Sequence, residues 1–117
     1  MSERTNDPTL LLLTSLTSGP KHGHALLLDI ESFAGVRLGP GTLYGAITRL
    51  EQRGLIEPVG SDDRRRPYRI TAAGAEILTA AVADLTRIVD EATARLRRER
   101  ERASAATGKG APQVATR

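Results

Sequence analysis

The sequence predicts a mainly α-helical fold that contains one small β-hairpin and ends in a long helix. Before Gly54 the period of the apolar residues is about 3.6, which is the periodicity of helices. The period changes to about two between residues 55 and 71, as expected for strands. From residue 78 to residue 96, steps of four and three alternate without interruption, which indicates a long helix with one apolar stripe.

Composition excludes several classes of protein. The 117 residues suffice for one domain with a modest core, and the absence of cysteine excludes disulfides, thiolate nucleophiles and cysteine metal sites. The apolar run at residues 10–13 is too short to span a membrane, so we expect a cytoplasmic protein without a membrane partner. No catalytic motif surrounds Ser15, His22, His24 or Asp29, so we expect no enzyme and no cofactor.

The two histidines form a His-x-His pattern, which raises the alternative of a metal site. Residues two apart on a helix point in different directions, and no third ligand cluster lies nearby in the sequence. We therefore expect no metal and interpret His22 as a turn residue and His24 as a surface residue.

The first two helices are predicted from their start and stop signals. Asp7 can cap free N–H groups and Pro8 suits the next position, while breaker residues 18–20 end the first helix. Leucines on more than one face suggest that other helices surround it. A second helix is expected from about His22 to Phe33, closed by Gly35, with its acidic residues, Asp29 and Glu31, facing water.

A third helix is predicted over residues 40–53, between Pro40 at its start and Gly54 after its end. Its apolar positions stack on one side and should be buried. These positions are Leu43, Ile47 and Leu50. The residues left facing outward or sideways can mostly donate or accept hydrogen bonds, and they are Thr42, Tyr44, Gly45, Thr48, Arg49 and Gln52.

Two short strands, residues 55–59 and 67–71, are expected to form a hairpin around a polar loop. Pro58 and Pro67 each lack a donor, so both belong at an edge or a strand end. Residues 61–71 carry four arginines against two aspartates, which makes this hairpin the basic part of the chain. The alternative is a solvated turn whose arginines pair with those aspartates.

The last helix is predicted from residue 72, with Thr71 as its N-cap, to about residue 102. Its heptad stripe comprises Leu78, Val82, Leu85, Val89, Ala92 and Leu96. At about 1.5 Å per residue the helix is roughly 46 Å long, too long for a small body to cover, so an identical chain should cover it. The alternative is that the stripe packs entirely on the first helix. Residues 103–117 lack periodicity and are expected to form a disordered tail.

This order of elements is that of a winged helix-turn-helix followed by a dimerisation helix, and the motifs resemble those of the PadR family of transcriptional regulators. The resemblance covers roughly residues 8 to 100 and is to the short branch with one C-terminal dimerisation helix. Its motifs are Ser18-Gly19-Pro20-Lys21-His22-Gly23, Gly41-Thr42-Leu43-Tyr44, Leu50-Glu51 with Gly54-Leu55-Ile56, and Tyr68-Arg69-Ile70-Thr71 with Ala73-Gly74. His24 stands where the family usually has an aromatic residue, and Gly45 where it usually has proline.

The resemblance implies double-stranded DNA as the partner. A major groove about 12 Å wide admits one helix, so Thr42, Gly45, Thr48 and Arg49 are candidates for base or groove contact, with Tyr44 reaching a phosphate. A second set, at the hairpin tip, would contact phosphates or a minor groove, and it comprises Arg64, Arg65 and Arg66.

The resulting interpretation has a DNA-binding domain over residues 1–71 and a dimerisation helix over residues 72–102. We expect a homodimeric repressor that reads a pseudo-palindromic operator with two recognition helices about 34 Å apart. We also expect it to leave the operator when a small-molecule effector binds near the first and last helices. The alternative is a winged-helix protein-interaction module that binds no specific DNA.

Overall fold

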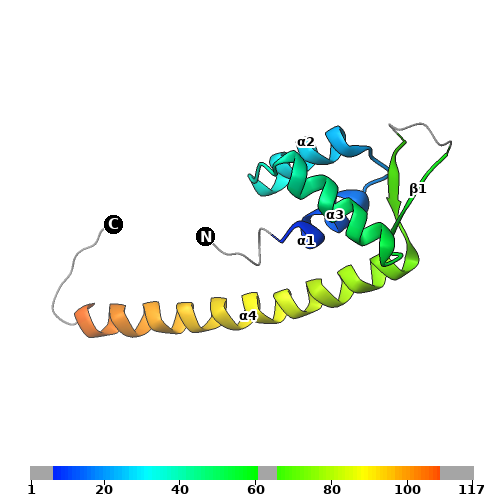
Figure 1. Cartoon of the computed structure of the whole chain (residues 1–117). Coiled ribbons are helices and arrows are strands. Elements are labelled where there is room, and N and C mark those ends of the chain that lie inside the picture. Colours follow the sequence, from blue (N-terminus) through cyan, green and yellow to red (C-terminus); the bar gives the residue numbers. More distant parts are fainter. Residues whose placement is uncertain (1–6, 61–65, 109–117) are drawn as a thin grey trace. The chain divides into compact units, whose positions relative to one another are not determined.

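The computed structural model describes residues 7–60 and 66–108, and it confirms the predicted fold class. The elements in chain order are α1 (Pro8–Leu16), α2 (Gly23–Ala34), α3 (Pro40–Gln52), β1 (Ile56–Pro58), β2 (Tyr68–Ile70) and α4 (Ala72–Gly108), as Figure 1 shows. The chain forms two compact units, one ending at Ala81 and one beginning at Val82.

The helix boundaries follow the capping signals in the sequence. Asp7 Oδ1 accepts a hydrogen bond from Thr9 N at 3.0 Å, which confirms the predicted cap of α1. Gly35 ends α2 in the left-handed conformation, with φ of 68°. Pro40 lies in the first turn of α3, where its missing N–H costs nothing.

The end of α3 is a Schellman motif that directs the chain into the hairpin. Gly54 has φ of 75°, and its N–H donates to Glu51 O at 3.0 Å. Leu55 N donates to Leu50 O at 2.9 Å, and both leucine side chains are buried. This hydrophobic contact between the last turn and the residue after the glycine fixes where β1 begins.

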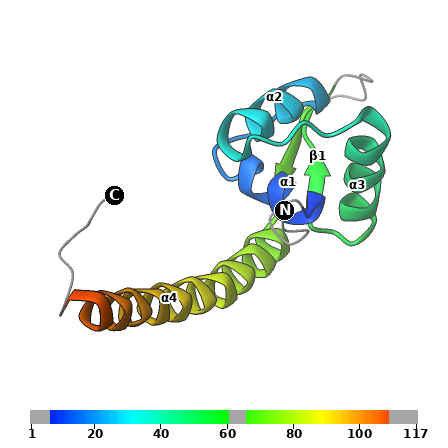
Figure 2. The same cartoon turned by 90° about the vertical axis from the view of Figure 1, so that its left-hand side faces the viewer.

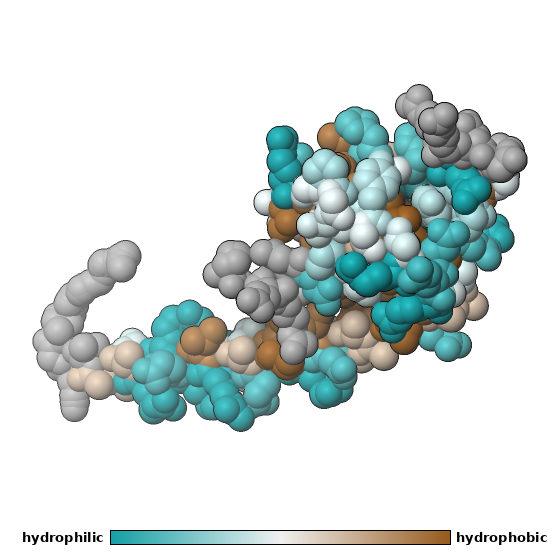
Figure 3. Space-filling view, in the orientation of Figure 1, coloured by the Kyte–Doolittle hydropathy of each residue, from teal (hydrophilic) through white to brown (hydrophobic). Residues whose placement is uncertain are grey.

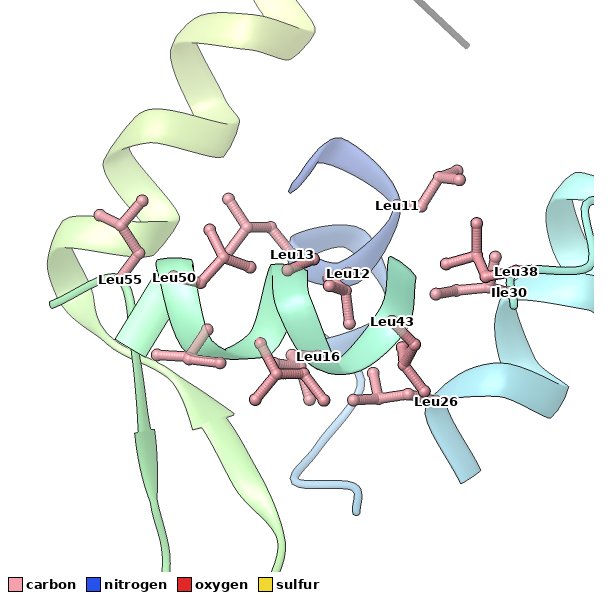
Figure 4. Packing of buried hydrophobic residues seen from close by; sticks show 13 residues of the cluster. Leu11, Leu12, Leu13, Leu16, Leu26, Ile30, Leu38, Leu43, Leu50 and Leu55 are labelled. Atoms are coloured by element: carbon pink, nitrogen blue, oxygen red, sulfur yellow. The ribbon is translucent and has the colours of Figure 1, made fainter. Parts of the chain in front are cut away.

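The core lies where α1, α2 and α3 meet, and it is built almost entirely from leucine and isoleucine. Figure 4 shows these side chains gathered behind α3, with Leu55 at one end of the cluster and Leu38 at the other. Helix α1 is surrounded as predicted, since four of its leucines are at most 4% exposed. Two apolar residues of α2, Leu28 and Phe33, remain about half exposed at 53% and 46%.

The hairpin pairs β1 with β2 in antiparallel register, with Ile56 opposite Ile70 and Glu57 opposite Arg69. Pro58 lies opposite Tyr68, whose N–H and C=O both bond to Lys21 instead, at 2.9 and 3.0 Å. Pro58 therefore occupies a position at which the ladder needs no donor. The pairing of Lys21 with Tyr68 holds β2 on both sides, a contact that the sequence pattern did not predict.

The prediction that Asp29 faces water holds only in part. Its carboxylate is only partly exposed and accepts a hydrogen bond from the hydroxyl of Ser15 at 2.6 Å, across the contact between α1 and α2. Ser15 is 1% exposed, and a buried hydroxyl requires a partner. Asp29 therefore faces the α1–α2 contact and satisfies the buried polar side chain there.

Helix α4 begins as predicted, because Thr71 Oγ1 accepts from Gly74 N at 3.1 Å. Its first turn packs closely on Leu55, the residue before β1, since a Cβ on Gly74 would collide with Leu55 O. The helix ends at Gly108, so the prediction of an end near residue 102 and a disordered tail from residue 103 is wrong over residues 103–108. Three of those residues are alanine, the strongest helix former. Residues 109–117 lie outside the described residues.

The second unit, from Val82, is the rest of α4. Most of its large apolar residues are exposed in the single chain, by 49% at Val82, 58% at Val89 and 62% at Leu96, whereas Leu85 is half-buried. Ion pairs one turn apart run beside them, as between Arg95 and Glu91 at 2.7 Å. Figure 3 shows hydrophobic residues among hydrophilic ones along this helix. Within the described residues, α4 and the other helices are too short or too polar to cross a membrane.

Candidate nucleic-acid interface

Helix α3 has one buried side and one exposed polar side, as its sequence predicts. Leu43, Ala46, Ile47 and Leu50 are at most 3% exposed. Figure 2 shows α3 at the edge of the first unit. The exposed side, which we call the outer face of α3, consists of Thr42, Tyr44, Gly45, Thr48, Arg49 and Gln52, all exposed except the half-buried Gly45.

The side chain of Tyr44, on the outer face of α3, contacts Gly23 at the start of α2. The atoms nearest to a Cβ placed on Gly23 are Oη, Cζ and Cε1 of this tyrosine, all closer than van der Waals contact allows. Gly23 is buried, and Tyr44 is 53% exposed. The phenol is therefore positioned where two helices meet, with one side open to a ligand.

Thr48 and Arg49 differ in the hydrogen bonds that they can still make. Thr48 Oγ1 donates to Tyr44 O at 3.0 Å, so its hydroxyl hydrogen is already used by the helix. Within residues 7–60 and 66–108, the structure gives the Arg49 guanidinium no hydrogen bond or ion pair. The guanidinium lies over Gly45, since a Cβ there would be 3.5 Å from Arg49 Nη1.

The basic tip of the hairpin is only partly described. Arg66 is half-exposed, whereas Arg64 and Arg65 lie outside the described residues, together with the two aspartates of the same loop. The fourth arginine of the hairpin, Arg69, forms an ion pair with Glu57, with Nη2 to Oε2 at 2.6 Å. Its charge is therefore balanced within the hairpin.

Lys21 has a structural role that sequence reasoning missed. Its Nζ donates to Ser15 O at 2.5 Å and to Ser18 Oγ at 2.7 Å, and lies 3.9 Å from Asp29 Oδ2. A lysine beside the last carbonyls of a helix stabilises its C-terminus, so the position just after α1 could have indicated this role. Because its backbone also pairs with Tyr68, Lys21 connects α1, α2 and the hairpin.

The histidine pair remains a surface feature. His22 and His24 are exposed, and His22 is the N-cap of α2 without a side-chain hydrogen bond. No group of three or more potential metal ligands exists among the residues whose positions are described. Neither histidine belongs to the outer face of α3.

Comparison with known proteins adds an independent observation. Residues 12–80 match the model of the Transcriptional regulator PadR-like family. An uncharacterized 37.1 kDa protein in a transposon of Streptomyces fradiae is 45% identical over 85 residues, which are 73% of this chain and 25% of that protein. The chain thus spans about a quarter of the length of this relative.

Several solved structures share the fold. A PadR family transcription regulator from Clostridium difficile R20291 has a TM-score of 0.65 at 20% identity, over 76% of this chain and 96% of that one. A transcriptional regulator from Clostridium thermocellum has a TM-score of 0.64 at 26% identity, over 78% of this chain and 95% of that one. A PadR family transcriptional regulator from Eggerthella lenta has a TM-score of 0.62 at 27% identity, over 75% of this chain and 80% of that one.

Proposed function

The chain belongs to the PadR-like family of transcriptional regulators, and on this premise we propose that it is a sequence-specific DNA-binding regulator. The observation that carries the proposal is the division of α3 into a fully buried apolar side and an exposed polar side. A helix with this division can enter a major groove without disturbing the core that holds it. Residues 1–71 would act as the DNA-binding domain, with Tyr44 and Arg66 contacting phosphates beside the bases.

The proposed regulator is a homodimer. The large apolar residues of α4 recur at heptad spacing. Val82, Val89 and Leu96 are about half exposed or more in the single chain, whereas Leu78 packs partly against the core of its own chain. Burying this stripe against a second copy of residues 72–102 would remove it from water and duplicate α3. Two copies of α3 related by a two-fold axis would read a pseudo-palindromic operator.

We propose that this dimer acts in the cytoplasm as a repressor and that a small-molecule effector releases it from the operator. The support is its family, which consists of transcriptional regulators. A reporter gene placed behind the selected operator should be expressed less when the chain is supplied. Higher expression in the presence of the chain would contradict repression.

Retention of genomic fragments tests the DNA-binding proposal. The full chain is immobilised, fragments of the source genome are passed over it at about 0.15 M salt, and retained fragments are sequenced. A few strongly enriched sites with inverted symmetry are expected. A double variant, Thr48→Ala with Arg49→Ala, should lose the enrichment and keep weak uniform retention through the hairpin. Uniform weak retention by the unaltered chain would instead favour a protein-interaction module.

A further inference from the structure

Arg49 is the one charged side chain on the outer face of α3. Gly45 has no side chain, and the hydroxyl hydrogen of Thr48 is bonded to the helix backbone. Thr48 can therefore offer a base edge only acceptor lone pairs and a methyl group. Of the three residues in the middle of this face, Gly45, Thr48 and Arg49, Arg49 is the one that offers strong hydrogen-bond donors.

The position of the guanidinium follows from helix geometry. Side chains on a helix lean toward its N-terminus, so residue 49 covers residue 45, one turn earlier. In this chain residue 45 is glycine, and Arg49 Nη1 lies 3.5 Å from where a Cβ would be. The guanidinium thus occupies space that a larger side chain at position 45 would take. Its donors remain free of partners within the described parts of the chain.

A guanidinium has five donors in a planar fork and no acceptor. In the major groove, guanine presents two neighbouring acceptors, O6 and N7, whereas adenine and cytosine present amino donors there. We propose that Arg49 is the specificity-determining residue of α3 and reads one guanine in each half-site, with Gly45 leaving the space for its guanidinium. The inference rests on the proposed function, and it adds which base is read and by which side chain.

The test uses operator duplexes in which single atoms of the base are removed. The full chain first selects sites from random duplexes, and guanines common to the half-sites are then replaced one at a time. Replacing the read guanine by 7-deazaguanine removes N7 but keeps O6, so it should weaken binding about 2- to 10-fold, roughly half of what a bidentate pair contributes. Inosine keeps O6 and N7, so it should bind nearly as well as guanine.

Three variants assign this effect to Arg49. Arg49→Ala should weaken binding to the intact operator and remove the penalty for 7-deazaguanine. Gly45→Leu, which retains the arginine but fills its space, should shrink the same penalty. Arg53→Ala, in the exposed arginine that caps the end of α3, is the matched control and should leave the penalty unchanged.

The outcomes separate this inference from the proposed function. If the unaltered chain selects a site but Arg49→Ala retains the full penalty for 7-deazaguanine, Arg49 is not the guanine reader and the inference alone is overturned. A Gly45→Leu variant with an unchanged penalty would overturn the role of Gly45. If the unaltered chain selects no site, the proposed function fails and the inference fails with it.

Discussion

At Gly23, the missing side chain makes room for the ring of Tyr44. The two residues belong to different helices, and the ring atoms lie where even a methyl group on Gly23 would clash. Tyr44 is 53% exposed, so the ring could move aside at modest cost if that space were filled. A change at Gly23 should therefore displace the phenol more than it destabilises the fold.

Replacing Gly23 by alanine should weaken operator binding about 2- to 10-fold, comparable to the loss of one hydrogen bond to a phosphate. Gly23→Ala and Tyr44→Ala should weaken binding to a similar extent, and the double variant should be no weaker than either single variant. Fluorescence anisotropy with a labelled operator measures all three dissociation constants. Losses that multiply in the double variant would show that the two residues act separately.

Lys21 is expected to contribute to stability, because its ammonium bonds to groups at the end of α1 and approaches Asp29. Lys21→Met should lower the free energy of unfolding by about 1–2 kcal/mol, measured by urea denaturation. Arg37→Met is the matched control, since its ion pair with Glu31 is largely exposed, at 76% for the arginine side chain. It should change stability by less than about 0.5 kcal/mol. Equal effects of the two changes would argue against the role of Lys21.

Among the elements, the hairpin should supply affinity that depends on charge. Replacing Arg64, Arg65 and Arg66 together by alanine should weaken binding and flatten its salt dependence by a slope of about 2 to 3, because fewer counterions are released. A titration of the dissociation constant against salt concentration measures the slope.

The control for the hairpin variant removes three positive charges from α4 instead. Arg95, Arg98 and Arg102 on α4 already lie beside Glu91 or Glu99. Changing these three to alanine should leave the slope as it is. Identical slopes for the hairpin variant and the unaltered chain would exclude phosphate contacts at the tip.

The elements themselves were largely predictable because their ends carry local signals. Pro40 and Gly54 bound α3 through backbone geometry that depends on nearby residues only, and the structure confirms both. The hydrogen bond between Asp29 and Ser15 joins two helices, and hydrophobic periodicity does not detect such a contact. The contact of Lys21 with Tyr68 likewise joins distant segments. Residues 103–108 were missed because alanine favours a helix without creating an apolar period.

The site was also predictable only in part, because some of its contacts join residues that are distant in the sequence. Periodicity separates the outer face of α3 from its buried side, and the exposures agree with that separation. It does not show that the Arg49 guanidinium lies over Gly45 or that Tyr44 rests on Gly23. These contacts depend on side-chain direction and on the packing of two helices. Which residues contact DNA stays a prediction.

For the whole molecule, the apolar stripe of α4 predicts a homodimer. Val89 is 58% exposed in the single chain, so Val89→Glu should leave the monomer folded and place two carboxylates in the seam of the dimer. Light scattering at micromolar concentration should give a dimer for the unaltered chain and a monomer for this variant. Circular dichroism should show that α4 remains helical.

Ala83→Glu is the matched control for the dimer, because residue 83 is exposed and lies off the stripe. It adds the same charge and should remain dimeric. A monomer for the unaltered chain would contradict the dimer proposal.

The strand β2 has a neighbour on each side, β1 on one and Lys21 on the other. The register of a strand held on both sides is fixed by these two pairings. Doubling the length of a loop costs only about 0.6 kcal/mol in closure entropy. The segment between Gly60 and Pro67 is therefore a natural graft point, where a peptide tag or a foreign recognition loop could be inserted while the helices keep their packing.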